Sequence, residues 1–134
     1  MLYAESSETI TAKERWLYTR GAPTALAIAL HELLNDVWRM AGWNIYAKHE
    51  WYDAENGGIE HIYAWVQDRG GRAIDIHGMH THAGAISNGD EVMQVGLDRL
   101  HAEADEIANA KQLVLANPAH FGLPDPHLVS EICA

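Results

Sequence analysis

The chain has 134 residues, 48% of them hydrophobic and 21% charged, a composition that indicates a single globular domain and excludes an intrinsically disordered chain. Nine basic and nineteen acidic residues give a net charge of −10, which disfavours direct binding to nucleic acid and permits a basic protein partner. The single cysteine, Cys133, excludes an intramolecular disulfide, and no membrane-spanning run or signal peptide is predicted, so we expect a cytoplasmic protein, from a bacterium or a virus-infected cell.

The first part of the chain predicts two helices separated by Gly21, which would adopt a left-handed conformation at the end of the first helix. The second helix begins at Pro23, since proline suits the first helical turn, and runs to about Met40 with apolar residues on more than one face. It is therefore expected to be the central, most buried helix. The first helix should be capped by Ser7 or Thr9 and should bury an apolar stripe: Ala12, Trp16 and Leu17.

The middle of the chain predicts an antiparallel meander, and the last third predicts helices. The expected strands are 43–52, 59–67 and 72–76, with a turn at Asn56-Gly57-Gly58, an irregular loop at 77–89, and helices at 91–101 and 102–116. The predicted fold class is α+β, with a central N-terminal helix packed on a small antiparallel β-meander, with C-terminal helices, in a single domain over residues 1–134.

A histidine and a carboxylate stand on the second and third predicted strands, at His61 and Asp75. A three-residue loop, Asp68-Arg69-Gly70, would pair Tyr63 with Asp75 and place His61 one diagonal step away on the same face. Loops of two or four residues would put the two groups on opposite faces. Side by side, the carboxylate would orient the imidazole as a general base. Alternatively, His61 is an exposed strand residue and Asp75 a turn acid.

Three segments resemble the papain-like and transglutaminase-like cysteine hydrolases, most closely their small bacterial and phage members. They are the helical Leu26–His31 (LAIALH), the strand His61–Val66 (HIYAWV) and Ile74–Gly78 (IDIHG) after the hairpin. This resemblance, which spans residues 21–78, implies amide-bond or side-chain amide chemistry on a protein or peptide, as in proteases, deamidases or transglutaminases. It also implies His61 as general base, Asp75 as its orienting group, and no cofactor.

The nucleophilic cysteine of these hydrolases is absent from this chain. At the start of the helix, where the resemblance places the thiol, the sequence reads Gly21-Ala22-Pro23-Thr24. Three explanations are open: Ala22 or a neighbour is an engineered replacement, Thr24 is the nucleophile, or the scaffold has lost catalysis and kept binding. The chain as written is therefore expected to be inactive or to use a substituted nucleophile. A second hypothesis is an acidic binding or inhibitor protein, such as a phage-encoded antagonist of a host factor.

The histidines and aromatic residues of the hairpin give further candidates. We expect three residues to contact a substrate: Trp65, Tyr63 and His77. A third hypothesis, a metal-dependent hydrolase, would use a set of residue types that suit a divalent ion: Asp75, His77, His80 and His82. Their spacing matches no known metal motif, and these histidines can instead face solvent. The helical segment from His31 begins like a zincin motif, but Asn35 replaces the second histidine, so no zinc site is predicted there.

Overall fold

The computed structural model describes residues 10–52, 59–87 and 91–127, and the side chains at 50–52 and 59–61 lie outside this description. The helical elements are α2 (Ala12–Trp16), the π-helical turn η2 (Leu17–Gly21), α3 (Pro23–Asp36), α4 (Gly84–Ser87), the 3₁₀ turn η4 (Leu97–Arg99), α5 (Ala104–Ala116) and the 3₁₀ turn η5 (Pro118–Phe121). The strands are β1 (Asn44–Tyr52), β2 (Ile59–Gln67), β3 (Ala73–Asp75), β4 (Gly78–His80) and β5 (Met93–Gln94).

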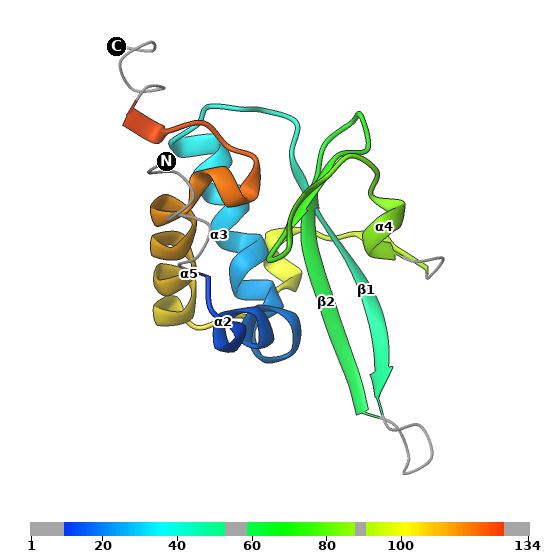
Figure 1. Cartoon of the computed structure of the whole chain (residues 1–134). Coiled ribbons are helices and arrows are strands. Elements are labelled where there is room, and N and C mark those ends of the chain that lie inside the picture. The colour runs from blue at the N-terminus through cyan, green and yellow to red at the C-terminus, as the bar shows by residue number, and fades with distance from the viewer. Residues whose placement is uncertain (1–9, 53–58, 88–90, 128–134) are drawn as a thin grey trace.

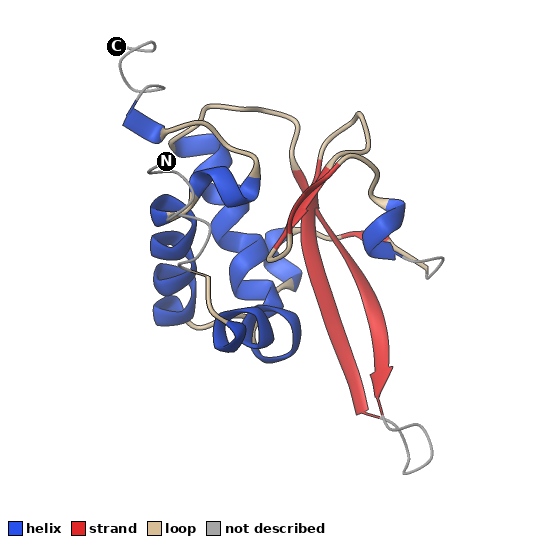
Figure 2. Ribbon diagram, in the orientation of Figure 1, coloured by secondary structure: helices blue, strands red, loops and turns tan. Residues whose placement is uncertain are grey.

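The elements form a helical layer against an antiparallel sheet with the strand order β4-β3-β2-β1-β5. Helices α2, α3 and α5 gather on one side of the sheet, and the short α4 lies on the other side (Figure 1). The far end of the β1–β2 hairpin extends past the helical layer (Figure 2). Helix α3 is central because it packs against both β2 and α5. The predicted α+β class, with its central N-terminal helix, is confirmed.

The first helix differs from the prediction in which residues it buries. Thr11 caps α2 through a reciprocal capping box with Glu14, whereas Ser7 and Thr9 lie outside the described residues. The helix continues as the π-helical turn η2, which turns Tyr18 into the core and leaves Trp16 60% exposed. The predicted stripe was wrong, since all three of its residues are exposed: Ala12, Trp16 and Leu17. Gly21 belongs to this π turn and is not left-handed.

Helix α3 begins at Pro23 as predicted, but it ends at Asp36, four residues before Met40. Its apolar residues face both the sheet and α5, which is why one narrow stripe does not describe it. The sheet residues that face α3 complete the main core: Ile45, Ala47, Ala64, Val66 and Ile74. A second, smaller cluster lies on the opposite face of the sheet beneath α4: Tyr63, Trp65, Ala73 and Ile86. The part of the sheet between α3 and α4 is therefore covered on both faces.

Two predictions for residues 77–101 were wrong. Residues 77–89, expected to be irregular, contain β4 and α4, and residues 91–101, expected to be helical, contain β5 and the 3₁₀ turn η4. Strand β5 forms because it pairs with β1, and the Val95 N–H extends the pairing by donating to the Ile45 carbonyl at 2.9 Å. Such long-range pairing overrides a helical pattern. The predicted helix at 102–116 is present as α5, and the turn at 56–58 lies outside the described residues.

The hairpin between β2 and β3 has a three-residue loop, but it begins one residue later than predicted. The Asp68 N–H donates to the Arg72 carbonyl at 2.9 Å, which leaves residues 69–71 as the loop. Gly71 supplies the left-handed conformation that such a loop needs, at φ +87°. The paired residues are Val66 with Ile74 and Gln67 with Ala73. Continued along the strands, this register places Trp65, and not Tyr63, opposite Asp75.

The Asp68 side chain closes this loop and gives a test of acid stability. Burial acts to raise the pKa of Asp68, but hydrogen bonds from the Arg72 side chain and backbone, the Arg72 charge and the Gly70 N–H outweigh it, so the pKa lies below its ordinary value. Because the folded-state pKa is lowered, this stabilisation is present above the unfolded-state value of about 4 and is lost as the pH falls through the folded-state pKa.

We expect Asp68→Asn to be less stable than the wild type near neutral pH, with the difference shrinking as the pH falls below about 4. Urea unfolding at a series of pH values measures this difference, and the exposed Asp98→Asn is the charge-matched control. A stability difference between wild type and Asp68→Asn that does not change with pH would contradict the expectation.

Candidate functional site

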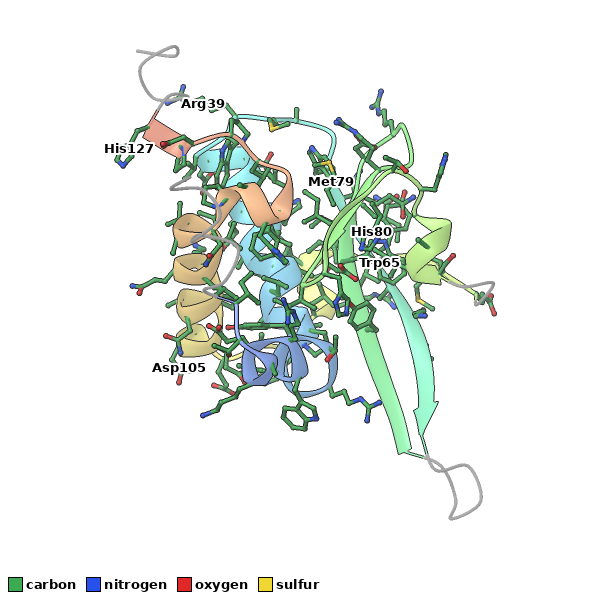
Figure 3. All side chains as sticks on the ribbon, in the orientation of Figure 1. Arg39, Trp65, Met79, His80, Asp105 and His127 are labelled. Carbon is green, nitrogen blue, oxygen red and sulfur yellow. The ribbon has the colours of Figure 1, made fainter. Side chains whose placement is uncertain are left out.

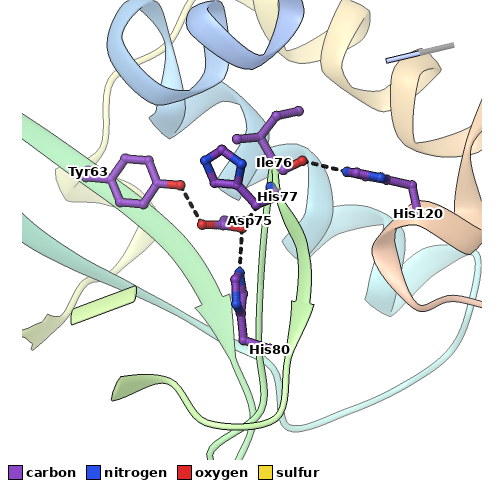
Figure 4. A network of polar contacts seen from close by, with 6 residues as sticks. All are labelled: Tyr63, Asp75, Ile76, His77, His80 and His120. Atoms are coloured by element: carbon purple, nitrogen blue, oxygen red, sulfur yellow. Dashed lines mark hydrogen bonds and ion pairs between the residues drawn. The ribbon is translucent and has the colours of Figure 1, made fainter. Parts of the chain in front are cut away.

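The most distinctive polar group of the structure is the buried carboxylate of Asp75, whose residue is only 4% exposed. The Tyr63 hydroxyl donates to its Oδ2 at 2.7 Å, and the His77 backbone N–H donates to its Oδ1 at 2.9 Å. The His80 Nε2 lies 2.9 Å from the same Oδ1 (Figure 4). An ionised carboxylate only accepts hydrogen bonds, so His80 Nε2 carries the proton in this contact. Asp75 thereby fixes the orientation of one imidazole and one phenol.

Three adjacent strands bring these groups together. Asp75 ends β3, the two-residue turn Ile76-His77 follows, and the register pairs Asp75 with Gly78 and Ala73 with His80. The Asp75 side chain caps the turn by accepting from the His77 N–H, as Asp residues do in tight turns. Tyr63 reaches the same carboxylate from β2. The local sequence Asp-Ile-His-Gly therefore builds the turn, and the sheet supplies Tyr63.

The C-terminal segment holds this turn from the other side. His120 in η5 lies with its Nε2 2.6 Å from the Ile76 carbonyl, so this nitrogen donates (Figure 4). The His120 ring also packs edge-on against Phe121, with a centroid separation of 4.9 Å. Gly78 comes very close to the His120 backbone, because a Cβ at position 78 would lie 2.7 Å from the His120 carbonyl oxygen. The turn that carries Asp75 is thus fixed to a segment 44 residues away in the chain.

A cavity of about 360 Å³ opens beside Asp75. Turn η2, the sheet, the β3–β4 turn and α4 all contribute residues to its lining. The lining residues are Thr19, Arg20, Lys48, Tyr63, Asp75, His77, His80, Ala85 and Ile86. Its volume suits a small molecule or a single side chain, because ligand pockets start at about 300 Å³.

Lys48 is a functional candidate that the sequence analysis missed. It stands on β1 directly opposite Tyr63, it is only 5% exposed, and its Nζ donates to the Ile86 carbonyl at 2.8 Å. Arg20, on η2, was also missed. The sequence did hold a signal for Lys48: it stands two residues after Tyr46 on the predicted strand, so the two side chains share one face of the sheet, the face that also carries Tyr63. No local pattern singles out Arg20.

The prediction that His61 lies beside Asp75 is wrong, because the register of the strands separates the two residues. His61 lies on β2 opposite Glu50, and its side chain is outside the described residues. Since Trp65 comes opposite Asp75, His61 is four residues, or about 13 Å, further along β2. The hairpin loop begins one residue later than predicted, which slides the whole register. Tyr63 and His80 contact the carboxylate that was expected to orient His61.

The segment expected to carry the nucleophile reaches the cavity through different residues. Ala22 is buried at the N-terminal cap of α3 and Thr24 is partly buried in its first turn, whereas Thr19 and Arg20 line the cavity. The Thr19 hydroxyl donates to the Arg15 carbonyl at 2.6 Å, as a helical threonine commonly does. None of the described residues that line the cavity carries a thiol, and Cys133 lies outside the described residues.

The three predicted substrate contacts have different surroundings. Tyr63 and His77 both line the cavity. Trp65 does not, because its ring is only 1% exposed, lies 6.1 Å from the Tyr63 ring and donates Nε1–H to Gln67 at 3.1 Å. Trp65 and His80 both lie on the face of the sheet toward α4 (Figure 3). Trp65 therefore packs beside Tyr63, which itself lines the cavity.

The metal hypothesis is not supported by the residues it named. Within the described part of the chain, no group of three His, Cys, Asp or Glu side chains could hold a metal ion. Asp75 contacts the His80 ring but only the backbone N–H of His77, and His82 is exposed and does not line the cavity. In α3, Asn35 Nδ2 donates to the His31 carbonyl at 2.7 Å, an ordinary helix contact.

Scans against models of protein families, against curated proteins and against solved structures find no match to this chain. Among the helices that the structure describes, none has the length and apolar content needed to cross a membrane. We therefore infer function from the cavity itself.

Proposed function

We propose that the chain is a papain- or transglutaminase-like hydrolase scaffold whose cavity binds a protein or peptide without cleaving it. The observation that carries this proposal is the contact between Tyr63 and Asp75. The resemblance places the imidazole of the pair on β2, but β2 presents the Tyr63 phenol to the carboxylate, and the imidazole that contacts Asp75 is His80 on β4. An imidazole exchanges protons near neutral pH and an ordinary phenol does not, so Tyr63 makes a poor general base.

The arrangement of elements supports the same proposal. Helix α3 follows η2, and both η2 and Asp75, which ends β3, contribute to the lining of the cavity. The resemblance rests on the same order along the chain: a helix (α3), then a strand (β2), then the acid Asp75 at the end of β3. The segment that should carry the thiol has Ala22 at the helix cap. Three explanations were given for the missing cysteine. The third, that the scaffold has lost catalysis and kept binding, assumes neither a replaced residue nor a nucleophilic Thr24.

The proposal also accommodates the acidic composition. A net charge of −10 suits a basic protein target and disfavours nucleic acid. An acidic binding or inhibitor protein would then be the function, and the hydrolase-like framework would be the structure that provides it.

Rebuilding the missing groups tests the scaffold. In a Cys133→Ser background, cysteine is placed in turn at Thr19 and Arg20, which line the cavity, and at Ala22, the cap of α3, with position 63 as Tyr or as His. We expect at least one of the three cysteines to react with iodoacetamide about tenfold faster near neutral pH when Tyr63→His is present, because an imidazole beside Asp75 would stabilise the thiolate.

The control is Ala108→Cys on the exposed face of α5, which should react at the same rate with either residue at position 63. Circular dichroism establishes that each variant is folded. If Tyr63→His accelerates none of the three cysteines, the hydrolase-like assignment fails.

A further inference from the structure

The charges that line the cavity differ in sign from those of the whole protein. Arg20 and Lys48 bring two positive charges, and among the described lining residues Asp75 is the acid that opposes them. Two of the three Lys, Arg and Asp side chains among the described lining residues are therefore cationic, although the chain carries −10. We propose that the cavity binds a small oxyanion, a carboxylate or phosphate group. This inference rests on the proposed binding function and concerns the one group that enters the cavity, whereas the net charge of −10 concerns the rest of the target surface.

The oxygens of Asp75 are already matched to donors within the chain. The Tyr63 hydroxyl, the His77 N–H and His80 Nε2 take three of the roughly four acceptor positions that a carboxylate offers. A cationic ligand would have to compete with these three donors for Asp75. An anionic ligand leaves all three contacts in place and meets the positive charges of Arg20 and Lys48.

Lys48 gives the anion a charge in a poorly solvated position. Its residue is 5% exposed, and one of its three ammonium donors goes to the Ile86 carbonyl. Electrostatic attraction is stronger in such a place than at the exposed surface. Lys48 and Arg20 both keep contacts within the chain, so the ligand adds to these contacts.

Arg20, on η2, also lines the cavity. A guanidinium presents its N–H groups as a planar fork, which matches the paired oxygens of a carboxylate or phosphate. The His77 ring is exposed at the cavity and offers a further nitrogen to the same ligand. The volume of about 360 Å³ is near the lower end of small-ligand pockets, so the ligand is a small anion or a single acidic side chain.

A titration followed by proton–nitrogen correlation spectra of the full chain tests the inference. The probes are glutarate, inorganic phosphate, the neutral glutaramide and the cationic putrescine. We expect glutarate or phosphate to shift the backbone signals of Lys48, Tyr63 and His77 and to bind at least about tenfold more tightly than glutaramide, as charge-assisted hydrogen bonds imply. Whichever anion binds more tightly identifies the carboxylate or the phosphate as the group recognised.

Glutaramide or putrescine binding as tightly as the anions would overturn the inference and leave the proposed binding function standing. Shifts with none of the four probes would also overturn it, and the cysteine experiment would then judge the scaffold separately.

Two charge removals locate the site. Lys48→Met and Arg20→Gln are each expected to weaken anion binding by about fivefold to tenfold. The matched control is Arg69→Gln, which removes the same charge from the exposed β2–β3 loop and should change binding by less than about twofold. Because Arg20 is exposed, Arg20→Gln should fold, and it tests whether the anion binds in this cavity even if Lys48→Met does not fold. Equal weakening by Arg69→Gln would show only general charge attraction and overturn the inference.

Discussion

Replacing Asp75 with alanine is expected to lower the free energy of unfolding by about 3–5 kcal/mol near neutral pH. The loss arises because Tyr63, His77 and His80 would each keep a donor without its acceptor in a mostly buried place. Asp75→Asn should lose less, since an amide oxygen still accepts from one side and the Tyr63 hydroxyl can accept from the amide nitrogen. Urea unfolding of the three proteins measures their free energies of unfolding, which should decrease in the order wild type, Asp75→Asn, Asp75→Ala.

The control for this change is Asp125→Ala, because Asp125 is exposed and accepts only a local hydrogen bond from the His127 N–H. Its effect should remain within about 0.5 kcal/mol, as for most surface substitutions. If Asp75→Ala costs no more than Asp125→Ala, the carboxylate is not the structural centre of the site and the three contacts are incidental.

Gly78→Ala is expected to cost about 3 kcal/mol or more. Gly78 has φ +113°, which side-chain-bearing residues rarely adopt, and its new Cβ would lie 2.7 Å from the His120 carbonyl oxygen. That oxygen belongs to the backbone, so no rotamer change relieves the clash. The β3–β4 turn and η5 would have to separate, which would also disturb the His120–Ile76 contact. Thermal and urea unfolding should both report the loss.

The matched control is Gly84→Ala in α4, where a Cβ would meet no heavy atom within 4 Å and φ is not positive. Alanine there should be neutral or stabilising by up to about 1 kcal/mol, because it favours helix and restricts the unfolded chain. Equal stability of the two glycine variants would contradict the close approach of η5 to the turn.

Local sequence was sufficient for the parts of this protein that are governed by local patterns. Alternation of side chains predicted β1 and β2, and Pro23 marked the first residue of α3. The run of apolar residues on several faces of α3 predicted its central place, which burial between β2 and α5 requires. The α+β class followed from this order of elements. Asp75 was also recognised as a chemically unusual acid, because it stands on an apolar strand next to a turn.

Tertiary structure alone decided which groups surround Asp75. A hairpin loop that begins one residue later than predicted moves every strand partner by two positions, and no local residue preference resolves so small a difference. Strands β4 and β5 are two or three residues long and form only because β3 and β1 are there to pair with them. The sequence therefore identified the acid, but strand pairing gave it Tyr63 and His80, and chain packing brought Lys48 and Arg20 to the same cavity.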